Sequence, residues 1–148
     1  MTLTKADHAA FSMAIESGDY HAAESLIGKH PELVSHGSWT PPPIHCAVLW
    51  NQPRIAELLL DNGADLEMLD PYRQTTPLRY AIMYGVTDLI PVLLSRGANA
   101  GPIIENGATA LQLARGAANG AYEEYEDLPS REEYEKVVAL LCQYGLTT

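Results

Sequence analysis

An eight-residue pattern that returns at a fixed spacing constrains this chain more strongly than any other feature. The sequence LLLDNGAD at residues 58–65 recurs as VLLSRGAN at residues 92–99, 34 positions later. A period between 20 and 50 residues is typical of architectures in which similar units stack and each unit contacts only its neighbours. The spacing therefore predicts a repeat protein.

The same register extends in both directions from this pair. The segment PIHCA at residues 43–47 recurs as PLRYA at 77–81, and the segment TPLRYA that ends there recurs as TALQLA at 109–114. In the other direction, Ala47 corresponds to Ala14, 33 positions earlier. Four successive units therefore share one pattern.

The last unit is longer than the others. Its closing segment VVALLCQYG, residues 137–145, matches residues 89–97 at a spacing of 48. The last unit thus holds an insertion of about fifteen residues beyond the 33-residue period, which we place as a loop at roughly 117–129. The sequence predicts a single domain, residues 1–148, whose repeats cover approximately residues 4–36, 37–69, 70–103 and 104–148.

A 33-residue unit that begins with T-P-L-H-x-A resembles the ankyrin repeat. The third unit, which opens with Thr76-Pro77-Leu78, matches best, and the second, with PIHCA, is nearly as close. The first and fourth units are degenerate, as expected of terminal repeats whose outer faces meet water. The resemblance implies an all-α fold, an ankyrin-like solenoid of four helix-turn-helix repeats with the insertion in the last repeat.

The spacing of apolar residues and prolines supports two helices in each unit. Ile55, Leu58 and Leu59 follow the i, i+3, i+4 spacing of a buried helix face. Pro53 fits the first turn of that helix, where no intrahelical N–H bond is lost. Pro91 fits only if its own helix begins near residue 88.

Residues at the helix ends support the same boundaries. Ser130 followed by Glu133 predicts a capping box that opens a final helix from about 131 to 143. A left-handed residue is favoured directly after a helix, and glycine adopts that conformation most readily. We expect it at three glycines that follow leucine-rich stretches: Gly63, Gly97 and Gly145.

Composition excludes several classes of protein. Nineteen acidic and nine basic residues give a net charge of −10, which disfavours binding to nucleic acid or to anionic lipid. No apolar run approaches the roughly 18 residues that span a bilayer, and the opening segment MTLTKADHAAF has no secretory signal. Cys46 and Cys142 lie far apart and outside any CxxC motif. We expect a cytoplasmic monomer that binds neither nucleic acid nor membrane.

The adjacent pair His45 and Cys46 is the one arrangement that suggests catalysis, because cysteine and histidine can form a nucleophile and its base. Adjacent residues on a helix point about 100° apart, so the two side chains do not share a proton directly. The family resemblance implies instead that His45 hydrogen-bonds neighbouring loops and that Cys46 is a small packed residue. Arg79 and Gln112 occupy the histidine position in the next two units, which either weakens this bonding or supplies different donors.

No other set of residues has catalytic or metal-binding spacing. The remaining histidines form no HxxxH or HExxH motif, and the glycines follow the repeat rather than a phosphate-binding loop. We therefore predict no catalytic residue, no metal and no cofactor.

Proteins of the ankyrin family bind partners through a concave face made of loop tips and the exposed positions of each first helix. Carried over by register, this face holds both tryptophans, and tryptophan, tyrosine and arginine dominate protein-binding surfaces. The alternative is that Trp50 or Tyr84 folds back over neighbouring helices as partial core. The predicted partner-binding residues are Trp39, Leu49, Trp50, Tyr72, Arg73, Met83, Tyr84, Glu105 and Asn106.

A run of acidic residues in the insertion gives a second candidate contact. Seven acids lie between residues 123 and 135, against one arginine. Such a run is either a solvated surface or an acidic loop that steers a basic partner. The residues of this possible acidic contact loop are Glu123, Glu124, Glu126 and Asp127.

The sequence therefore predicts a non-enzymatic protein–protein interaction module with a concave aromatic face, whose partner is another protein. One alternative is a small acidic inhibitor or immunity-type protein that masks a basic partner. A second, from another class, is a hydrolase or transferase that uses His45 and Cys46. The enzyme alternative requires a histidine and a carboxylate that converge within hydrogen-bond reach in a cleft.

Overall fold

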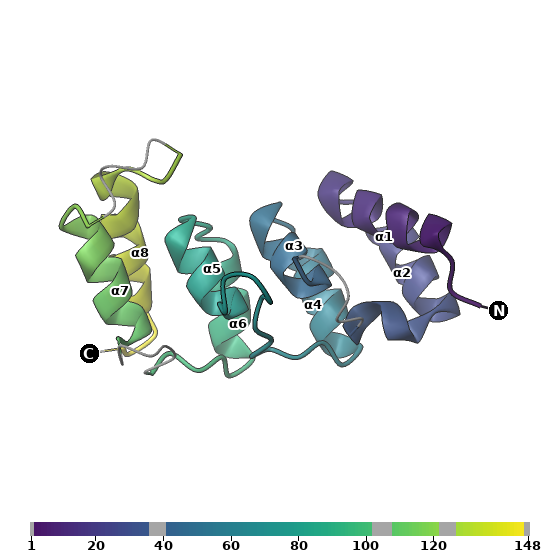
Figure 1. Cartoon of the computed structure of the whole chain (residues 1–148). Helices are drawn as coiled ribbons and strands as arrows, with labels where there is room; N and C mark the ends of the chain where they lie inside the picture. The colour runs from purple at the N-terminus through teal and green to yellow at the C-terminus, as the bar shows by residue number, and fades with distance from the viewer. Residues whose placement is uncertain (1, 36–40, 102–107, 122–126, 147–148) are drawn as a thin grey trace. The chain divides into compact units, whose positions relative to one another are not determined.

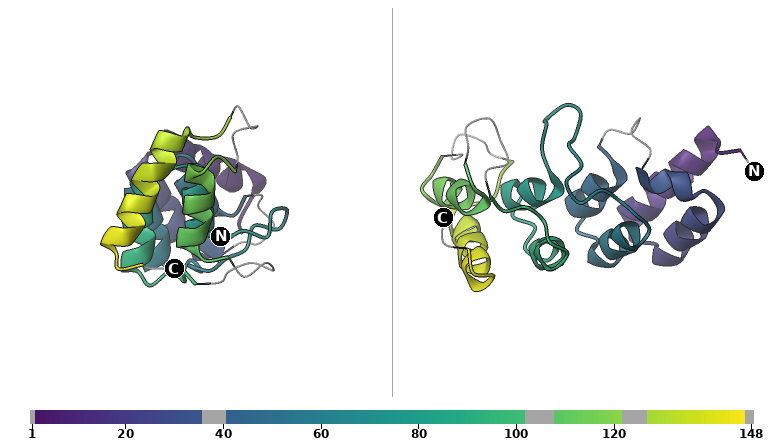
Figure 2. Two further views of the ribbon diagram at one scale, coloured as in Figure 1. Left: turned by 90° about the vertical axis from the view of Figure 1, so that its left-hand side faces the viewer. Right: turned by 90° about the horizontal axis from the view of Figure 1, so that it is seen from below.

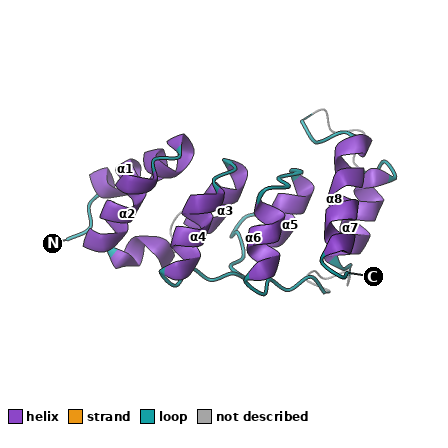
Figure 3. Ribbon diagram, turned by 180° about the vertical axis from the view of Figure 1, so that it is seen from behind, coloured by secondary structure: helices purple, strands orange, loops and turns teal. Residues whose placement is uncertain are grey.

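The computed structural model describes residues 2–35, 41–101, 108–121 and 127–146. These residues form eight α-helices and one 3₁₀ helix, and they contain no β-strand (Figures 1 and 3). The chain divides into two compact units, residues 1–77 and 78–148. Each unit holds two pairs of consecutive helices.

The first unit contains the first two predicted repeats. Helices α1 (Lys5–Ser17) and α2 (Tyr20–Lys29) form one pair, and α3 (Pro43–Leu49) and α4 (Pro53–Asp61) form the next. A 3₁₀ helix, η1 (Pro31–Ser35), follows α2. Helix α1 packs against both α2 and α3, and α2 also packs against α4, so each pair buries its apolar side against the other.

The second unit contains the helix pairs of the last two predicted repeats, whereas the loop that opens the third repeat, residues 70–75, belongs to the first unit. Its helices are α5 (Pro77–Met83), α6 (Leu89–Ser95), α7 (Ala110–Ala118) and α8 (Arg131–Gln143). Helices α7 and α8 pack directly against each other, as Figure 2 also shows. The predicted all-α fold of four helix pairs, with an insertion in the last, is confirmed for the described residues.

The core of both units follows the sequence repeat. The alanine at the centre of each first helix is buried, because a methyl side chain lets the neighbouring helices approach closely. Leucine and isoleucine on the second helices fill the space around it. The four central alanines are Ala14 (4% exposed) and Ala47, Ala81 and Ala114 (each 0%).

The predicted helix ends are confirmed. Ser130 accepts a hydrogen bond from the Glu133 backbone N–H while the Glu133 carboxylate accepts one from the Ser130 backbone, and α8 begins at residue 131. Pro53 is the first residue of α4, and Pro91 lies in the first turn of α6, whose N-cap is Asp88. The three helix-end glycines are left-handed, with φ of +93° at Gly63, +91° at Gly97 and +81° at Gly145.

A second left-handed position follows each first helix. Gly18 and Gly85 hold it in the first and third repeats, with φ of +76° and +63°. The second repeat places Asn51 there, at φ +51°. Asparagine tolerates this conformation better than other residues with a β-carbon, so the repeat geometry is kept without glycine.

The predicted insertion begins later than expected. Residues 117 and 118 belong to α7, which is two residues longer than the corresponding helix α5. The physical reason is the composition Ala117-Ala118, which favours helix, and Ala117 is buried. The described part of the insertion, 119–121 and 127–130, is not helical, as predicted.

Candidate functional site

His45 connects two segments of the first unit. Its ring lies in α3 and is fully buried, and its Nε2 atom is 2.6 Å from the carbonyl oxygen of Thr75, thirty residues later. This contact ties the first helix of the second repeat to the loop that leads into the third. Burial lowers the pKa of His45, although the bond to Thr75 and the charge of Asp70 oppose that shift. The predicted inter-loop role of His45 is confirmed.

Cys46 is packed, and its thiol is held by a hydrogen bond. It is 9% exposed, and its thiol donates a hydrogen bond of 3.4 Å to the carbonyl oxygen of Pro41. Burial, followed by the negative charges of Glu16 and Asp70, raises the pKa of the thiol to about 11. Since the thiolate is the nucleophile, a raised pKa opposes covalent catalysis. With His45 Nε2 held by Thr75, the pair does not form a nucleophile and its base.

The loop before α5 is held in one conformation by its own backbone. The backbone N–H of Asp70 donates to the carbonyl oxygen of Thr75 (3.0 Å), and the N–H of Gln74 donates to the carbonyl oxygen of Asp70 (2.7 Å). The Asp70 carboxylate accepts the backbone N–H groups of Tyr72 (2.8 Å) and Arg73 (3.3 Å). Gln74 is left-handed, with φ of +48°. This loop stands out beyond the helices of the first unit (Figure 2, right).

The tip of this loop exposes two of the predicted partner-binding residues. Tyr72 is 82% exposed, the highest value among large apolar side chains in the described residues, and Arg73 is also exposed. A loop already fixed in conformation loses little entropy when its tip is bound. The 70–75 loop is therefore a rigid support for an exposed tyrosine.

The ends of the first helices in the first unit also expose apolar side chains. Leu49 is 40% exposed and Trp50 47%, so Trp50 is not folded back into the core. Met13 on α1 is 66% exposed, and the sequence analysis missed it. The signal was present: Met13 lies one helical turn before Glu16 and Ser17, the α1 residues that correspond by register to Leu49 and Trp50.

The corresponding positions of the second unit are less accessible. Met83 and Tyr84 are both half-buried. The Tyr84 ring packs against that of Tyr80, with centroids 5.0 Å apart and planes inclined by 52°. The carbonyl oxygen of Met83 accepts a 2.6 Å hydrogen bond from the Tyr134 hydroxyl of α8. Partial burial, weighed as the alternative for Tyr84, is what the structure shows for this residue.

Several predicted site residues lie outside the described residues. Asp127 is described and exposed, at the end of the insertion. The others belong to the first and third loop tips and to the acidic run, and they stay predictions: Trp39, Glu105, Asn106, Glu123, Glu124 and Glu126.

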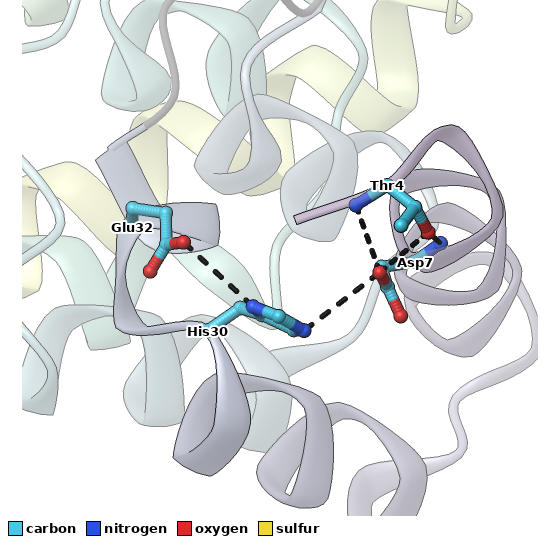
Figure 4. Close-up of polar contacts among 4 residues, drawn as sticks. All are labelled: Thr4, Asp7, His30 and Glu32. Carbon is cyan, nitrogen blue, oxygen red and sulfur yellow. Dashed lines mark hydrogen bonds and ion pairs between the residues drawn. The ribbon is translucent and has the colours of Figure 1, made fainter. Parts of the chain in front are cut away.

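A buried histidine near the N-terminus was not predicted. His30 is 2% exposed; its Nε2 lies 3.7 Å from Asp7 and its Nδ1 3.7 Å from Glu32 (Figure 4). Asp7 also forms the capping box of α1 with Thr4, and hydrogen bonds to Thr4 are the main reason why the pKa of Asp7 is lowered. The contact with Asp7 joins the end of α2 to the start of α1, and the contact with Glu32 joins the end of α2 to η1. His30 therefore has a structural role.

Gln112 answers one question that the sequence left open. Its side-chain oxygen accepts the backbone N–H of Thr109 at 2.9 Å, within the capping box of α7. In the fourth repeat, the residue at the histidine position therefore caps the N-terminus of the helix to which it belongs. Among the described residues, no group of three or more histidine, cysteine or acidic side chains is placed to hold a metal ion. No described helix has the length and apolar character needed to cross a membrane.

The chain is a helical repeat protein, because its helices are paired in 33-residue units and a histidine bridges successive repeats. It has a candidate binding face, because residues on first helices and on a loop tip are exposed. Residues 44–123, just over half of the chain, match the family model described as ankyrin repeats in three copies. The chain belongs to the ankyrin repeat family.

The chain is similar to short parts of several larger proteins. It is 47% identical over 51 residues to NF-kappa-B inhibitor alpha of Homo sapiens, which covers 34% of this chain and 16% of the relative. It is 33% identical over 100 residues to glycerophosphocholine phosphodiesterase gde1 of Schizosaccharomyces pombe, covering 66% and 9%. It is 30% identical over 89 residues to the putative ankyrin repeat protein FPV014 of fowlpox virus, covering 59% and 20%. The chain thus spans a fifth or less of each relative. Ankyrin repeats indicate a protein–protein interaction module, which is the class we predicted.

Proposed function

We propose that this chain binds a partner protein through the first-helix ends and the loop tip of its first unit, a face that is concave in ankyrin arrays. One observation carries the proposal. Six large apolar side chains are exposed among the described residues, and five of them belong to the first unit. They are Met13, Leu49, Trp50, Leu69 and Tyr72.

The chemistry of these side chains suits a binding surface. Tryptophan, tyrosine and methionine are enriched where proteins meet, and truncation of a central aromatic residue typically costs about 2 kcal/mol or more, roughly thirtyfold in affinity. Trp50 lies at the end of α3, which is packed on both sides by α1 and α4. Tyr72 lies on a loop that its own hydrogen bonds hold. Both anchors are thus presented by well-supported backbone.

The half-buried Met83 and Tyr84 have a smaller share in this proposal. Both belong to the second unit, and the Tyr84 ring packs on that of Tyr80, so they stay secondary candidates for partner contact. The possible acidic contact loop, Glu123, Glu124, Glu126 and Asp127, has a separate part in the proposal, because charge influences the rate of association more than affinity. The cytoplasmic location and monomeric state predicted from the sequence are part of the same proposal.

The test compares variants in an affinity purification from the native host, read by quantitative mass spectrometry. Trp50→Ala and Tyr72→Ala should each reduce recovery of the same partner. Tyr144→Ala is the matched control, because Tyr144 is 45% exposed, close to the 47% of Trp50, but lies after α8 in the second unit. If a partner is recovered equally with the two test variants but is lost with the control, the binding surface lies elsewhere.

A second candidate is an acidic inhibitor that masks a basic partner. Two observations favour it: the net charge of −10 and the similarity to a protein named as an inhibitor, NF-kappa-B inhibitor alpha. It uses the same face and adds a consequence for the partner, namely loss of that partner's own activity. Titration of the recovered partner with the purified chain distinguishes an inhibitor from an adaptor.

A further inference from the structure

The ends of α1 and α3 carry a small apolar surface with one carboxylate at its edge. We call it the α1–α3 patch, and define it by Met13, Leu49, Trp50 and Glu16. The three apolar side chains are 66%, 40% and 47% exposed, and Glu16 is exposed as well. The inference below rests on the proposed function and concerns the chemistry of the partner.

Helix α1 packs against α3, and two further observations concern the end of α1. The charge of Glu16 acts on the thiol of Cys46, which lies one helical turn before Leu49 and Trp50. A β-carbon at Gly18 would lie 2.8 Å from the side-chain oxygen of Gln52, two residues beyond Trp50. Glu16 and Trp50 each lie two residues before this close approach of Gly18 and Gln52, so the carboxylate and the indole belong to adjacent helix ends.

Glu16 has no partner of its own in the described part of the chain, where its carboxylate makes no hydrogen bond or ion pair. Of the basic residues in the first unit, Arg54 lies over the ring of Tyr20, 4.7 Å from its centroid. Lys29 acts on the carboxylate of Asp7, which lies in the first turn of α1, whereas Glu16 lies in the last turn of that helix. In water this exposed carboxylate is hydrated at little cost. A partner that covers the patch removes that water, and the carboxylate then requires a cation or a donor.

We propose that the α1–α3 patch binds a segment of the partner protein that carries a large apolar side chain and, close to it, an arginine or lysine. The apolar side chain covers Leu49 and Trp50, and the cation pairs with Glu16. Arginine is favoured over lysine, because its planar group also stacks on an indole ring. An acidic segment is rejected, because its charge would face Glu16 across a dehydrated surface.

Helix packing sets the spacing of the two recognised side chains. Packed helices are about 8–10 Å apart between axes, and an extended chain advances about 3.3 Å per residue. An apolar residue over α3 and a cation over α1 are therefore about two or three positions apart in an extended segment. This spacing turns the inference into a pattern that can be read in selected peptides.

The experiment selects a phage-displayed library of random 12-residue peptides on the intact protein and on four variants. Trp50→Ala removes the apolar anchor. Glu16→Gln removes the charge, and Glu16→Arg reverses it. The control is Glu24→Arg, which changes the net charge equally but lies on α2, where Glu24 is exposed. Thermal melts confirm that each variant is folded.

We expect the wild type and Glu24→Arg to enrich peptides with an apolar residue and an arginine or lysine two or three positions away. Glu16→Gln should lose the basic preference, and Glu16→Arg should favour acidic residues at that position. Resynthesised peptides should bind Glu16→Gln about two- to fivefold more weakly than the wild type, the range of a single exposed ion pair.

The outcomes separate the two proposals. Peptides that depend on Trp50 but show no charge preference, or the same preference with Glu16→Arg, overturn the inference about the partner and leave the proposed face intact. The proposed face is overturned if the enriched peptides bind Trp50→Ala as tightly as the wild type. It is also overturned if no peptide is enriched. Inversion of the charge preference by Glu24→Arg would show that net charge alone selects the peptides, which also overturns the inference.

Discussion

His45 combines burial, a hydrogen bond and an ionisable ring in one residue, so its contribution to stability depends on pH. Burial lowers the pKa of His45 below the ordinary value of 6.5, so the unfolded chain binds this proton more readily than the folded chain. Its contribution is therefore fully present above about pH 6.5 and declines as the pH falls below that value.

We expect His45→Ala to lower the free energy of unfolding by about 0.5–1.5 kcal/mol at pH 7.5, because the carbonyl of Thr75 loses one of its two donors and keeps only the backbone N–H of Asp70. His45→Gln keeps a neutral donor and should flatten the loss of stability between pH 7.5 and 5.5. Urea unfolding at both values measures the two effects. Equal pH dependence in the wild type and in His45→Gln would contradict this account.

The left-handed glycines allow a matched comparison of backbone effects. Gly97 has φ of +91° and Gly28 lies within α2, and a β-carbon at either position would meet no atom within 4 Å. Gly97→Ala should therefore destabilise by about 1 kcal/mol through the backbone alone, whereas Gly28→Ala should stabilise by about 0.5 kcal/mol through helix propensity. Thermal melts measure both changes, and the same sign for the two would refute the assignment.

Some residue roles could be predicted from the sequence and others could not. The helix-end glycines and His45 follow from the repeat, because each occupies a defined position of the repeat unit. The pair Asp7 and His30 does not, since the two residues are 23 positions apart and only the folded first repeat brings them together. Met13 does not follow from the register for a simpler reason. The register assigns to the binding face the residues directly before the turn that ends each first helix, and Met13 lies one helical turn earlier.

At the scale of a single element, α8 illustrates how a helix is started. Hydrogen bonds to the backbone and side chain of Ser130 are the main reasons why the pKa of Glu133 is lowered. The capping box therefore contributes stability above about pH 4.5 that is lost as the pH falls below it. We expect Ser130→Ala to cost about 1 kcal/mol at pH 7. In circular dichroism melts, the gap between the variant and the wild type should narrow near pH 3; a constant gap would argue against the box.

Helices were predicted more reliably than the segments between them. The start of α8 at 131, the position of Pro91 and the caps follow from local rules that operate within a few residues. The end of α7 was misplaced because the chain after Ala114 remains favourable to helix for another turn, and sequence periodicity alone does not show where packing ends. The 70–75 loop was also only partly anticipated: Tyr72 and Arg73 were predicted at its tip, but the hydrogen bonds that fix it depend on Asp70 and Thr75.

For the molecule as a whole, charge is the property with the longest reach. A net charge of −10 should accelerate association with a basic partner at low salt. Replacing Glu123, Glu124, Glu126 and Asp127 by their amides should slow association several-fold at about 20 mM salt and hardly at all at about 500 mM. Stopped-flow or surface-plasmon measurements against the recovered partner test this. An effect on dissociation that persists at high salt would place the acidic run within the binding face.

The hydrogen bond between Tyr134 and Met83 has a consequence for the order in which the chain folds. Repeat proteins fold quickly because their contacts are close in sequence, but this contact joins residues 51 positions apart. Closing a loop of this length costs more entropy than forming the contacts within a helix pair, so we expect the start of α8 to dock after the rest of its unit has formed. Tyr134→Phe should then accelerate unfolding and leave the folding rate nearly unchanged, as chevron kinetics would show. The last repeat would thus be the last to fold and the first to unfold. The acidic insertion, which precedes α8 in the sequence, would then adjoin the part of its unit that unfolds most readily.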